Sequence, residues 1–481
     1  MKGSTVIVRT RFAPSPTGYM HIGNLRTALF AYLTARRNNG VFILRIEDTD
    51  QERNIPEALA AIYASLALAG LDYDEGPGKD GGHGPYVQSE RLDIYKAHAE
   101  RLLASGGAFR CFCKKDDTGQ EDAEPVRRDP CRFLTEHEIK TKINAGESFV
   151  IRQRIPESGS TTFVDEVYGE ITIENSQLDD QVLLKSDGFP TYNFANVVDD
   201  HLMDITHVMR GQEYLSSTPK YNLLYESFGW PIPIYVHLPL IVKADGSKFS
   251  KRLGDPSFED LVRMGYLPEA IVNYIALLGW NPGDEREFFT LADLERVFSI
   301  DQINKSSAAF SFDKLTWING EHIRALSGDE FHTLAEKYYP DELSQFDTRK
   351  ISRLMQVRTE KLTDIPQAVA FFYDLPECDV SLYQHEKSKC TPQISLDVLR
   401  SVLPVLEELE VWDNDSLLQA LKAFIQARGY KVGTVMWPIR TALSCVLVTP
   451  GGATELADIL GKEETLRRIK AGIEKLENAA K

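Results

Sequence analysis

Apolar and polar positions in the first part of the chain follow two different periods. From Val6 to Arg11 they alternate as in a strand, and from Leu25 to Leu33 the apolar residues recur at the spacing of one helical face. This helix is expected to end near Asn38-Asn39-Gly40, before the apolar run Val41 to Ile46, which predicts a buried strand. Strand, helix and strand in this order predict a right-handed βαβ unit with parallel strands.

The same order of elements returns between residues 204 and 242. A strand is expected to end at Arg210, a helix to begin at Ser217 or Thr218 with Pro219 in its first turn, and a strand to follow in the string IYVHLPLIV. Together the two regions predict an α/β fold with one parallel, Rossmann-like sheet. An α+β insertion with β-like strings such as SFVIRQRI and EITI is expected to divide this sheet at about residues 95–190.

Amphipathic helices dominate the chain beyond about residue 325, with almost no strand signal between them. Examples are LDVLRSVLPVLEELEVW, SLLQALKAFIQARG and ELADILGKEETLRRIKAGIEKLENAA. This change predicts an all-α C-terminal domain, either a bundle or two small helical units.

Composition narrows the class of protein. Hydrophobic residues make up 43% of the 481 residues and charged residues 26%, as in an ordinary globular protein, and no apolar run is long enough to span a membrane. The net charge of -17 argues against non-specific nucleic-acid binding. This charge does not exclude a local basic face on an acidic protein, because phosphate contacts depend on the local potential. Six cysteines in a chain of this length fit reduced thiols inside a cell better than a disulfide framework.

A stiff elbow follows the first strand. Pro14 and Pro16 restrict the backbone, Gly18 allows a free turn, and His21-Ile22-Gly23-Asn24 opens the next helix. Loops at the carboxyl end of a parallel strand bind ligands, and a helix N-terminus favours phosphate. A proline-rich turn with a surface histidine is the alternative interpretation.

A cationic loop follows the last strand of the second region. It runs from Gly246 to Arg252 and carries Lys248 and Lys251 with Ser250 between them. Such a loop can close over a triphosphate and stabilise the charge that develops on it, although a solvated basic loop has the same composition.

The elbow and the cationic loop together resemble the two signatures of class I aminoacyl-tRNA synthetases. His21-Ile22-Gly23-Asn24 is similar to the His-Ile-Gly-His signature, and Lys248-Phe249-Ser250-Lys251-Arg252 to the Lys-Met-Ser-Lys-Ser signature. The strings RFAPSPTG, LRIEDTD, YDEGP, GPYVQSERL and LLKSDGFPTYNFANVVDDHLM resemble the bacterial glutamyl-tRNA synthetase family almost from end to end. Asn24 stands where the signature has a second histidine, so it can act only through hydrogen bonds.

This resemblance implies a reaction and its partners. Glutamate would attack the α-phosphorus of ATP, with Mg²⁺ bridging the phosphates, to give glutamyl-adenylate and pyrophosphate. A ribose hydroxyl at the 3′ end of glutamate tRNA would then take the glutamyl group and release AMP. A cytoplasmic monomer without membrane contact is expected. The implied domains are a catalytic domain in two halves (1–94 and 191–255), an acceptor-binding insertion (95–190), a stem-contact linker (256–325) and a helical anticodon-binding domain (326–481).

The substrate has two carboxylates and one ammonium, so its pocket needs at least two cations and one anion. Arg11, Glu47 and Arg210 all lie at predicted carboxyl ends of strands and hence on one rim. The resemblance implies that both arginines hold carboxylates and that Glu47 holds the ammonium. It also implies further glutamate contacts at Ala13, Ser15, Tyr192 and Asn196. The implied ATP contacts are Pro14, Thr17, Gly18, His21, Gly23, Asn24, Glu213, Ile241, Lys248, Ser250 and Lys251, of which His21, Lys248 and Lys251 would be catalytic.

Three cysteines, Cys111, Cys113 and Cys131, resemble the zinc site of some family members. Tetrahedral zinc needs four ligands, and Phe133 stands where a histidine or tyrosine often provides the fourth. His137, Asp129 or water could replace that ligand. Metal-free cysteines are the other interpretation.

Arg358 resembles a family arginine that faces the third anticodon base, which favours an enzyme restricted to glutamate tRNA. An enzyme that also glutamylates glutamine tRNA is the alternative.

Other classes of protein explain the sequence less well. A non-catalytic RNA-binding protein would not need His21, Lys248 and Lys251. A nucleotidyltransferase for another small acid, or a truncated paralogue that modifies a tRNA base, would not need the helical C-terminal domain.

Overall fold

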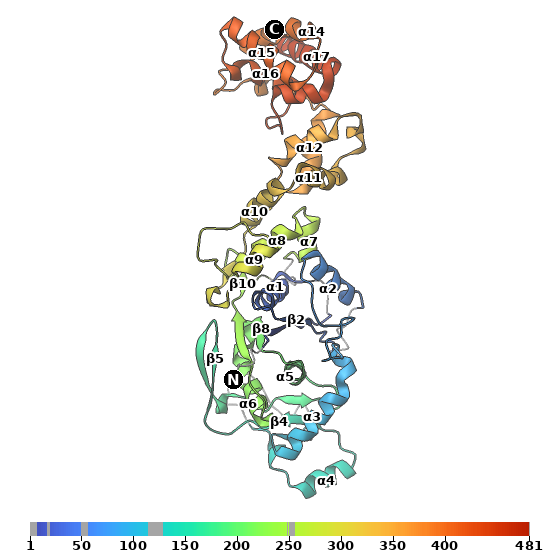
Figure 1. Cartoon of the computed structure of the whole chain (residues 1–481), viewed down its shortest axis with the longest axis vertical. Helices are drawn as coiled ribbons and strands as arrows, with labels where there is room; N and C mark the ends of the chain where they lie inside the picture. The colour runs from blue at the N-terminus through green and yellow to red at the C-terminus, as the bar shows by residue number, and fades with distance from the viewer. Residues whose placement is uncertain are drawn as a thin grey trace. The chain divides into compact units, whose positions relative to one another are not determined.

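The chain forms two compact units in the computed structural model (Figure 1). The structure describes residues 7–16, 20–49, 56–113, 128–247, 249 and 255–480. Unit 1 comprises Met1–Arg263 and Pro268–Leu315, and unit 2 comprises Met264–Leu267 and Thr316–Lys481.

A six-stranded sheet of order β2-β1-β8-β9-β5-β6 lies at the centre of unit 1. Its strands are β1 (Arg9–Phe12), β2 (Val41–Leu44), β5 (Ser160–Asp165), β6 (Gly169–Glu174), β8 (His207–Gly211) and β9 (Ile234–Leu238). All neighbouring strands pair in parallel except β5 and β6, which form an antiparallel hairpin. The parallel sheet predicted from the sequence is therefore confirmed, and the carboxyl ends of β1, β2, β8 and β9 meet at one edge.

The β5–β6 hairpin lies inside the stretch that the sequence assigns to the insertion, yet it extends the central sheet. Phe163 of β5 packs edge-on against Tyr235 of β9, and Asp165 bonds to His237 of the same strand. The other strands of this stretch, β3 (Ala108–Cys111), β4 (Val150–Gln153) and β7 (Val182–Leu184), form a separate three-stranded sheet.

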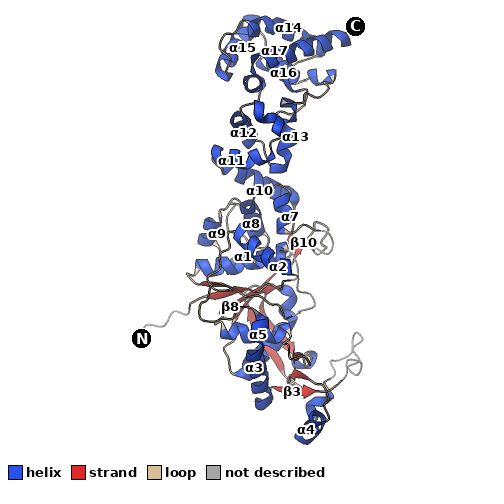
Figure 2. Ribbon diagram, turned by 90° about the vertical axis from the view of Figure 1, so that its right-hand side faces the viewer, coloured by secondary structure: helices blue, strands red, loops and turns tan. Residues whose placement is uncertain are grey.

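Helices cover both faces of the central sheet (Figures 1 and 2). Helix α1 (Ile22–Arg37) packs on one face against β1, β2 and β8, and α5 (Tyr192–Leu202) lies on the other. Helix α6 (Thr218–Phe228) begins after Ser217 with Pro219 in its first turn, as predicted. The string IYVHLPLIV divides into β9 and a two-residue strand, β10 (Ile241–Val242), which pairs with β11 (Ala308–Ala309). The helices of unit 1 are α1 (Ile22–Arg37), α2 (Pro56–Leu68), α3 (Leu92–Ser105), α4 (Glu136–Asn144), α5 (Tyr192–Leu202), α6 (Thr218–Phe228), α7 (Phe258–Arg263), α8 (Pro268–Leu277) and α9 (Leu291–Val297).

Unit 2 contains helices and no strand among its described residues, which confirms the predicted helical C-terminal domain. Helix α10 (Phe312–Ala325) runs from unit 1 into it. The others are α11 (Gly328–Ala335), α12 (Thr348–Gln356), α13 (Ile365–Val369), α14 (Pro392–Glu407), α15 (Asn414–Arg428), α16 (Val432–Ser444) and α17 (Ala453–Ala479). Helix α17 is interrupted at Gly461, whose φ is 78°. Within the described parts of both units, no helix is both long and apolar enough to cross a bilayer.

Candidate active site

A cleft of about 330 Å³ opens where β1, β8 and β9 end. Most of the candidate residues line it: Arg11, Ala13, Pro14, Ser15, His21, Gly23, Asn24, Glu47, Tyr192, Arg210, Glu213 and Ile241. Thr17, Gly18, Lys248, Ser250 and Lys251 lie outside the described residues. Asn196 is buried in α5 and is not part of the lining, and its amide nitrogen has no hydrogen-bond partner within the described chain.

The elbow after β1 is tied to the segment after β2 by two backbone hydrogen bonds. The carbonyl of Phe12 accepts from the amide of Arg45 at 3.0 Å, and the carbonyl of Pro14 accepts from the amide of Glu47 at 3.0 Å. Proline has no amide hydrogen, but its carbonyl remains an acceptor. The stiff elbow therefore positions the backbone of Glu47 as well as its own residues.

His21 caps the N-terminus of α1. Its Nδ1 accepts a hydrogen bond from the amide of Gly23 at 3.0 Å. A nitrogen that accepts carries no proton, so the neutral imidazole of His21 bears its proton on Nε2. The ring also lies 5.9 Å, centre to centre, from the ring of Phe249, the one described residue between Lys248 and Arg252. Phe249, the described residue of the second signature, thus meets the first signature at the cleft.

Arg11 is already paired with a carboxylate. Its Nε donates to Asp200 at 3.0 Å and its Nη2 to the same carboxylate at 3.3 Å, while Nη1 donates to the carbonyl of Met209. Arg45 donates to Asp200 at 2.7 Å and to Glu47 at 2.9 Å. Burial opposes the ionisation of Asp200, but the charges of Arg11 and Arg45 lower its pKa. A buried, hydrogen-bonded network of this kind holds its members in one geometry.

Glu47 differs electrostatically from Asp200. Burial raises the pKa of Glu47 to about 7, although the charges of Arg45 and Arg11 act in the opposite direction. The carboxyl is thus poised between its neutral and ionised forms near neutral pH. An ammonium group placed beside it would favour the ionised form.

Arg210 has no carboxylate within salt-bridge distance in the described chain, although it is only 5% exposed. Its Nε donates to Nε2 of His237 at 3.0 Å, and its Nη2 donates to the hydroxyl of Thr218 at 2.8 Å. The guanidinium also lies over the ring of Tyr221, 4.5 Å from its centre. A buried cation held only by neutral groups at the edge of a cleft is suited to an anionic ligand.

Several residues that organise this site were not predicted from the sequence. They are Arg45, Asp165, Asp199, Asp200 and His237. Arg45 lies directly after an apolar strand, and His237 lies within one. A polar residue in an apolar strand is the signal that could have marked these two. The partners of the three aspartates depend on contacts distant in sequence.

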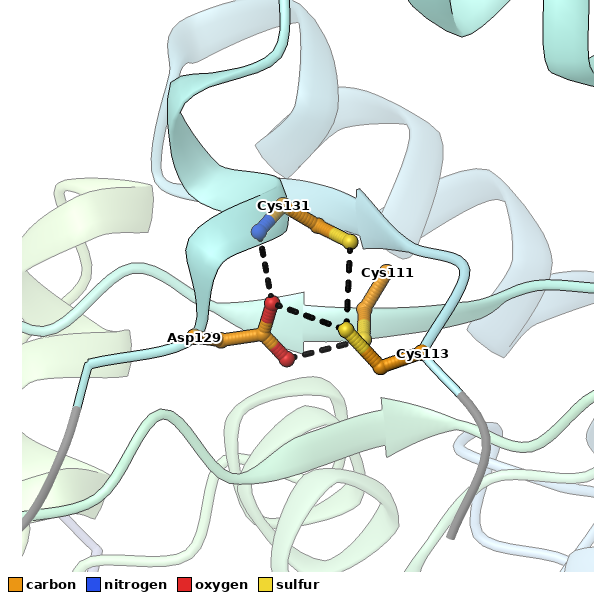
Figure 3. A group of neighbouring side chains, drawn as sticks. All are labelled: Cys111, Cys113, Asp129 and Cys131. Carbon is orange, nitrogen blue, oxygen red and sulfur yellow. Dashed lines mark hydrogen bonds between the residues drawn. The ribbon is translucent and has the colours of Figure 1, made fainter. Parts of the chain in front are cut away.

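The three cysteines come together with Asp129 in unit 1 (Figure 3). One ligand atom from each residue lies within 4.8 Å of the others. The thiol of Cys111 lies 2.8 Å from the Asp129 carboxylate, and the thiols of Cys113 and Cys131 are 3.5 Å apart. Asp129 turns inward because it also accepts from the amide of Cys131, at the start of a short 3₁₀ helix.

Asp129, one of the replacements considered for the fourth ligand, lies with the three cysteines in a group of four side chains that could hold a metal ion. His137 and Phe133 are exposed and do not belong to that set. Burial raises the pKa of Cys111 to about 11, with Asp129 adding to the effect, and burial also raises the pKa of Cys113. Both thiols therefore need a cation before they deprotonate near neutral pH.

Arg358 lies in unit 2, exposed and two residues beyond the end of α12. Burial and the nearby charge of Arg358 both lower the pKa of Arg440 in α16. Two arginines and the exposed apolar side chains of Val357, Leu447 and Val448 thus lie on the described part of unit 2. Cations beside apolar side chains can contact phosphates and unstacked bases.

Comparison with known proteins gives a consistent result. Residues 7–317 match the family of class I tRNA synthetases (E and Q), catalytic domain, and residues 330–473 match an anticodon binding domain. The chain is 55% identical to a glutamate–tRNA ligase of Clostridium acetobutylicum over 98% of this chain and 99% of that one. It is 56% identical to the same enzyme of Clostridium botulinum over 98% of each chain. A crystal structure of a glutamate–tRNA ligase from Elizabethkingia meningosepticum, in complex with its amino acid, superposes with a TM-score of 0.86 at 33% identity, covering 98% of this chain and 99% of that one.

Proposed function

The chain belongs to the class I tRNA synthetases for glutamate and glutamine, and from this membership we propose how its residues carry out the reaction of a glutamate–tRNA ligase. The enzyme uses ATP to activate glutamate and transfers the glutamyl group to tRNA in protein synthesis. No side-chain nucleophile is required for either step. Catalysis then depends on positioning the reactants and on stabilising charge at the phosphorus.

Glutamate binds in the cleft through the three groups predicted from the sequence. Arg210 carries this assignment, because it is a buried cation without a carboxylate partner in the described chain and it lines the cleft. It holds the side-chain carboxylate. Arg11, oriented by Asp200, uses its remaining hydrogens for the α-carboxylate, and Glu47 accepts the ammonium. Ala13, Ser15 and Tyr192 complete the proposed pocket, whereas Asn196 is buried in α5 and does not line it.

Glutamine is rejected by the same group. Its side-chain amide is neutral, so glutamine would leave the Arg210 guanidinium buried without a counter-charge. An excluded substrate of nearly the same shape is therefore distinguished by charge and not by size.

ATP binds along the elbow and the start of α1. His21 donates from Nε2 to the phosphates, the amide of Asn24 faces them at the helix N-terminus, and Gly23, Pro14, Glu213 and Ile241 contact the nucleotide. The proposed contacts of Thr17, Gly18, Lys248, Ser250 and Lys251 fall outside the described residues. Mg²⁺ is expected to accompany ATP, held mainly by phosphate oxygens.

Three segments of the chain are proposed to contact tRNA. The insertion at residues 95–190 contacts the acceptor end, residues 256–325 contact the stem, and the helical part at 326–481 contacts the anticodon, with Arg358 as one reader. The enzyme is proposed to be restricted to glutamate tRNA, and to act as a monomer in the cytoplasm.

Zinc fits the cluster of Cys111, Cys113, Cys131 and Asp129, because three thiols and a carboxylate are ligands that zinc accepts and they already lie close together. Four protein ligands leave no open position, so the metal would be structural. It would join β3 to the segment that begins at Asp129.

ATP–pyrophosphate exchange with glutamate, without tRNA and with either tRNA, tests the proposed reaction. Glutamate-dependent exchange that needs glutamate tRNA, together with charging of that tRNA alone, supports the proposal. Efficient glutamylation of glutamine tRNA would instead establish the relaxed specificity. Exchange that depends on another acid would overturn the assignment of the cleft.

A further inference from the structure

Three side chains from three neighbouring strands form a hydrogen-bonded chain beneath the cleft. Asp165 at the end of β5 lies 2.6 Å from Nδ1 of His237 in β9, and Nε2 of His237 lies 3.0 Å from Nε of Arg210 in β8. His237 is completely buried, and Asp165 is 1% exposed. Of these three residues, only Arg210 lines the cleft.

The positions of the protons follow from the donors available. An arginine Nε can only donate, so Nε2 of His237 must be the acceptor and Nδ1 must carry the proton. Nδ1 then donates to Asp165, whose carboxylate also accepts from the amides of Val167, Tyr168 and His237. The imidazole is therefore neutral, and Asp165 fixes both its tautomer and its orientation.

A protonated His237 would not fit this arrangement. Its Nε2 hydrogen would face the Nε hydrogen of Arg210, and two cations would lie side by side. Burial also lowers the pKa of His237, which favours the neutral imidazole, although Asp165 acts in the opposite direction. The remaining contacts of the Arg210 guanidinium, the Thr218 hydroxyl and the faces of three tyrosine rings, are also neutral.

We propose that His237, oriented by Asp165, is the positioning residue that aims the Arg210 guanidinium at the side-chain carboxylate of glutamate. Ring faces fix the plane of a guanidinium but not its rotation within that plane, whereas a hydrogen bond at Nε fixes the rotation. Since His237 and Thr218 take up Nε and one Nη2 hydrogen, the other edge of the guanidinium is available for the substrate. The inference rests on the proposed role of Arg210 and adds the residues that make that role specific.

Two amide substitutions separate the two hydrogen bonds of His237. His237→Asn places an amide nitrogen near the position of Nδ1, so it keeps the bond to Asp165 and loses the acceptor for Arg210. His237→Gln places an amide oxygen near the position of Nε2, so it keeps an acceptor for Arg210. His207, a half-buried histidine at the opposite end of β8, provides the matched control His207→Gln.

Aminoacylation of glutamate tRNA by the full-length enzyme is the assay, with the KM for glutamate and for ATP measured separately. His237→Asn is expected to raise the KM for glutamate about 10-fold or more, as for the loss of a hydrogen bond to a charged group. His237→Gln is expected to stay within about threefold of the wild type. The KM for ATP and the melting temperature of both His237 variants are expected to change little. The control His207→Gln is expected to differ little from the wild type in all of these measurements.

The outcome also separates this inference from the assignment on which it rests. If Arg210→Ala raises the KM for glutamate but His237→Asn does not, His237 has no positioning role. If Arg210→Ala leaves that KM unchanged, the proposed glutamate site itself is wrong. Equal defects in the asparagine and glutamine variants, or an equal loss for ATP, would indicate a purely structural histidine and overturn the inference.

Discussion

The ionisation of Glu47 should control the affinity for glutamate near neutral pH. Burial raises the pKa of this carboxyl to about 7, and its proposed partner is the substrate ammonium, which binds only the ionised form. The fraction of enzyme molecules with an ionised Glu47, which can bind the ammonium, is then about nine-tenths at pH 8 and about one-tenth at pH 6. Because the apparent dissociation constant varies inversely with this fraction, affinity should fall about tenfold from pH 8 to pH 6.

Calorimetry measures both parts of this prediction. Binding of glutamate at pH 7 should release about half a proton, since the ammonium drives the carboxyl into its ionised form. Titrations in buffers with different ionisation enthalpies report that proton directly. Glu47→Gln is the control, and it should bind glutamate much more weakly with no dependence on pH in this interval. A wild-type affinity that is constant between pH 6 and pH 8, without proton release, would refute the reasoning.

The same pKa has an effect on stability with a definite sign. The carboxyl of Glu47 binds its proton more tightly in the folded state, with a pKa of about 7, than at its ordinary value of 4.5. Its contribution to stability is therefore fully present below pH 4.5 and is lost as the pH rises through about 7. The ionised carboxylate costs the ligand-free fold roughly 3 kcal/mol at pH 8. Glu47→Gln should thus raise the melting temperature of the ligand-free enzyme at pH 8 while it weakens glutamate binding.

Three further predictions concern other parts of the chain. Lys251→Ala should reduce ATP–pyrophosphate exchange by orders of magnitude and leave tRNA affinity nearly unchanged, and near-normal exchange would remove its proposed role. Purified enzyme should contain about one zinc ion per chain, and Cys131→Ser should lose that metal together with thermal stability; metal analysis well below one zinc in the wild type would rule out the site. Gly40→Ala should destabilise the fold by about 1–3 kcal/mol in denaturant unfolding, because its Cβ would lie 2.1 Å from the backbone oxygen of Val8, whereas Gly328→Ala, with open space around it, should not.

Local patterns in the sequence were sufficient for the elements that frame the cleft. The helical period of α1, the turn residues at Asn38-Asn39-Gly40 and the proline at the start of α6 depend only on near neighbours. The rule that parallel strands present ligands at their carboxyl ends then placed Arg11, Glu47 and Arg210 on one rim.

Features that depend on distant contacts could not be read in this way. The β5–β6 hairpin joins the central sheet through a pairing between Asp165 and Tyr235 that no local pattern announces. The fourth member of the cysteine cluster depends on how the turn at Asp129 folds back toward Cys111, and not on the spacing of ligands. The carboxylate partner of Arg11, Asp200, likewise comes from a helix far along the chain.

The two arginines of the cleft show why one site can be both rigid and selective. Arg11 is neutralised by Asp200 within the protein, so in the proposed glutamate site it would contribute geometry more than net charge. Arg210 has neutral neighbours, and burial raises the pKa of Glu47 to about 7. If both cations were paired internally, a neutral side chain would fit as well as a charged one. The counter-charge of Arg210 must come from the ligand, whereas Glu47 already pairs with Arg45, which it shares with Asp200. A molecule with an ammonium at one end and a second carboxylate at the other would therefore supply the charge that Arg210 lacks and favour the ionised form of Glu47.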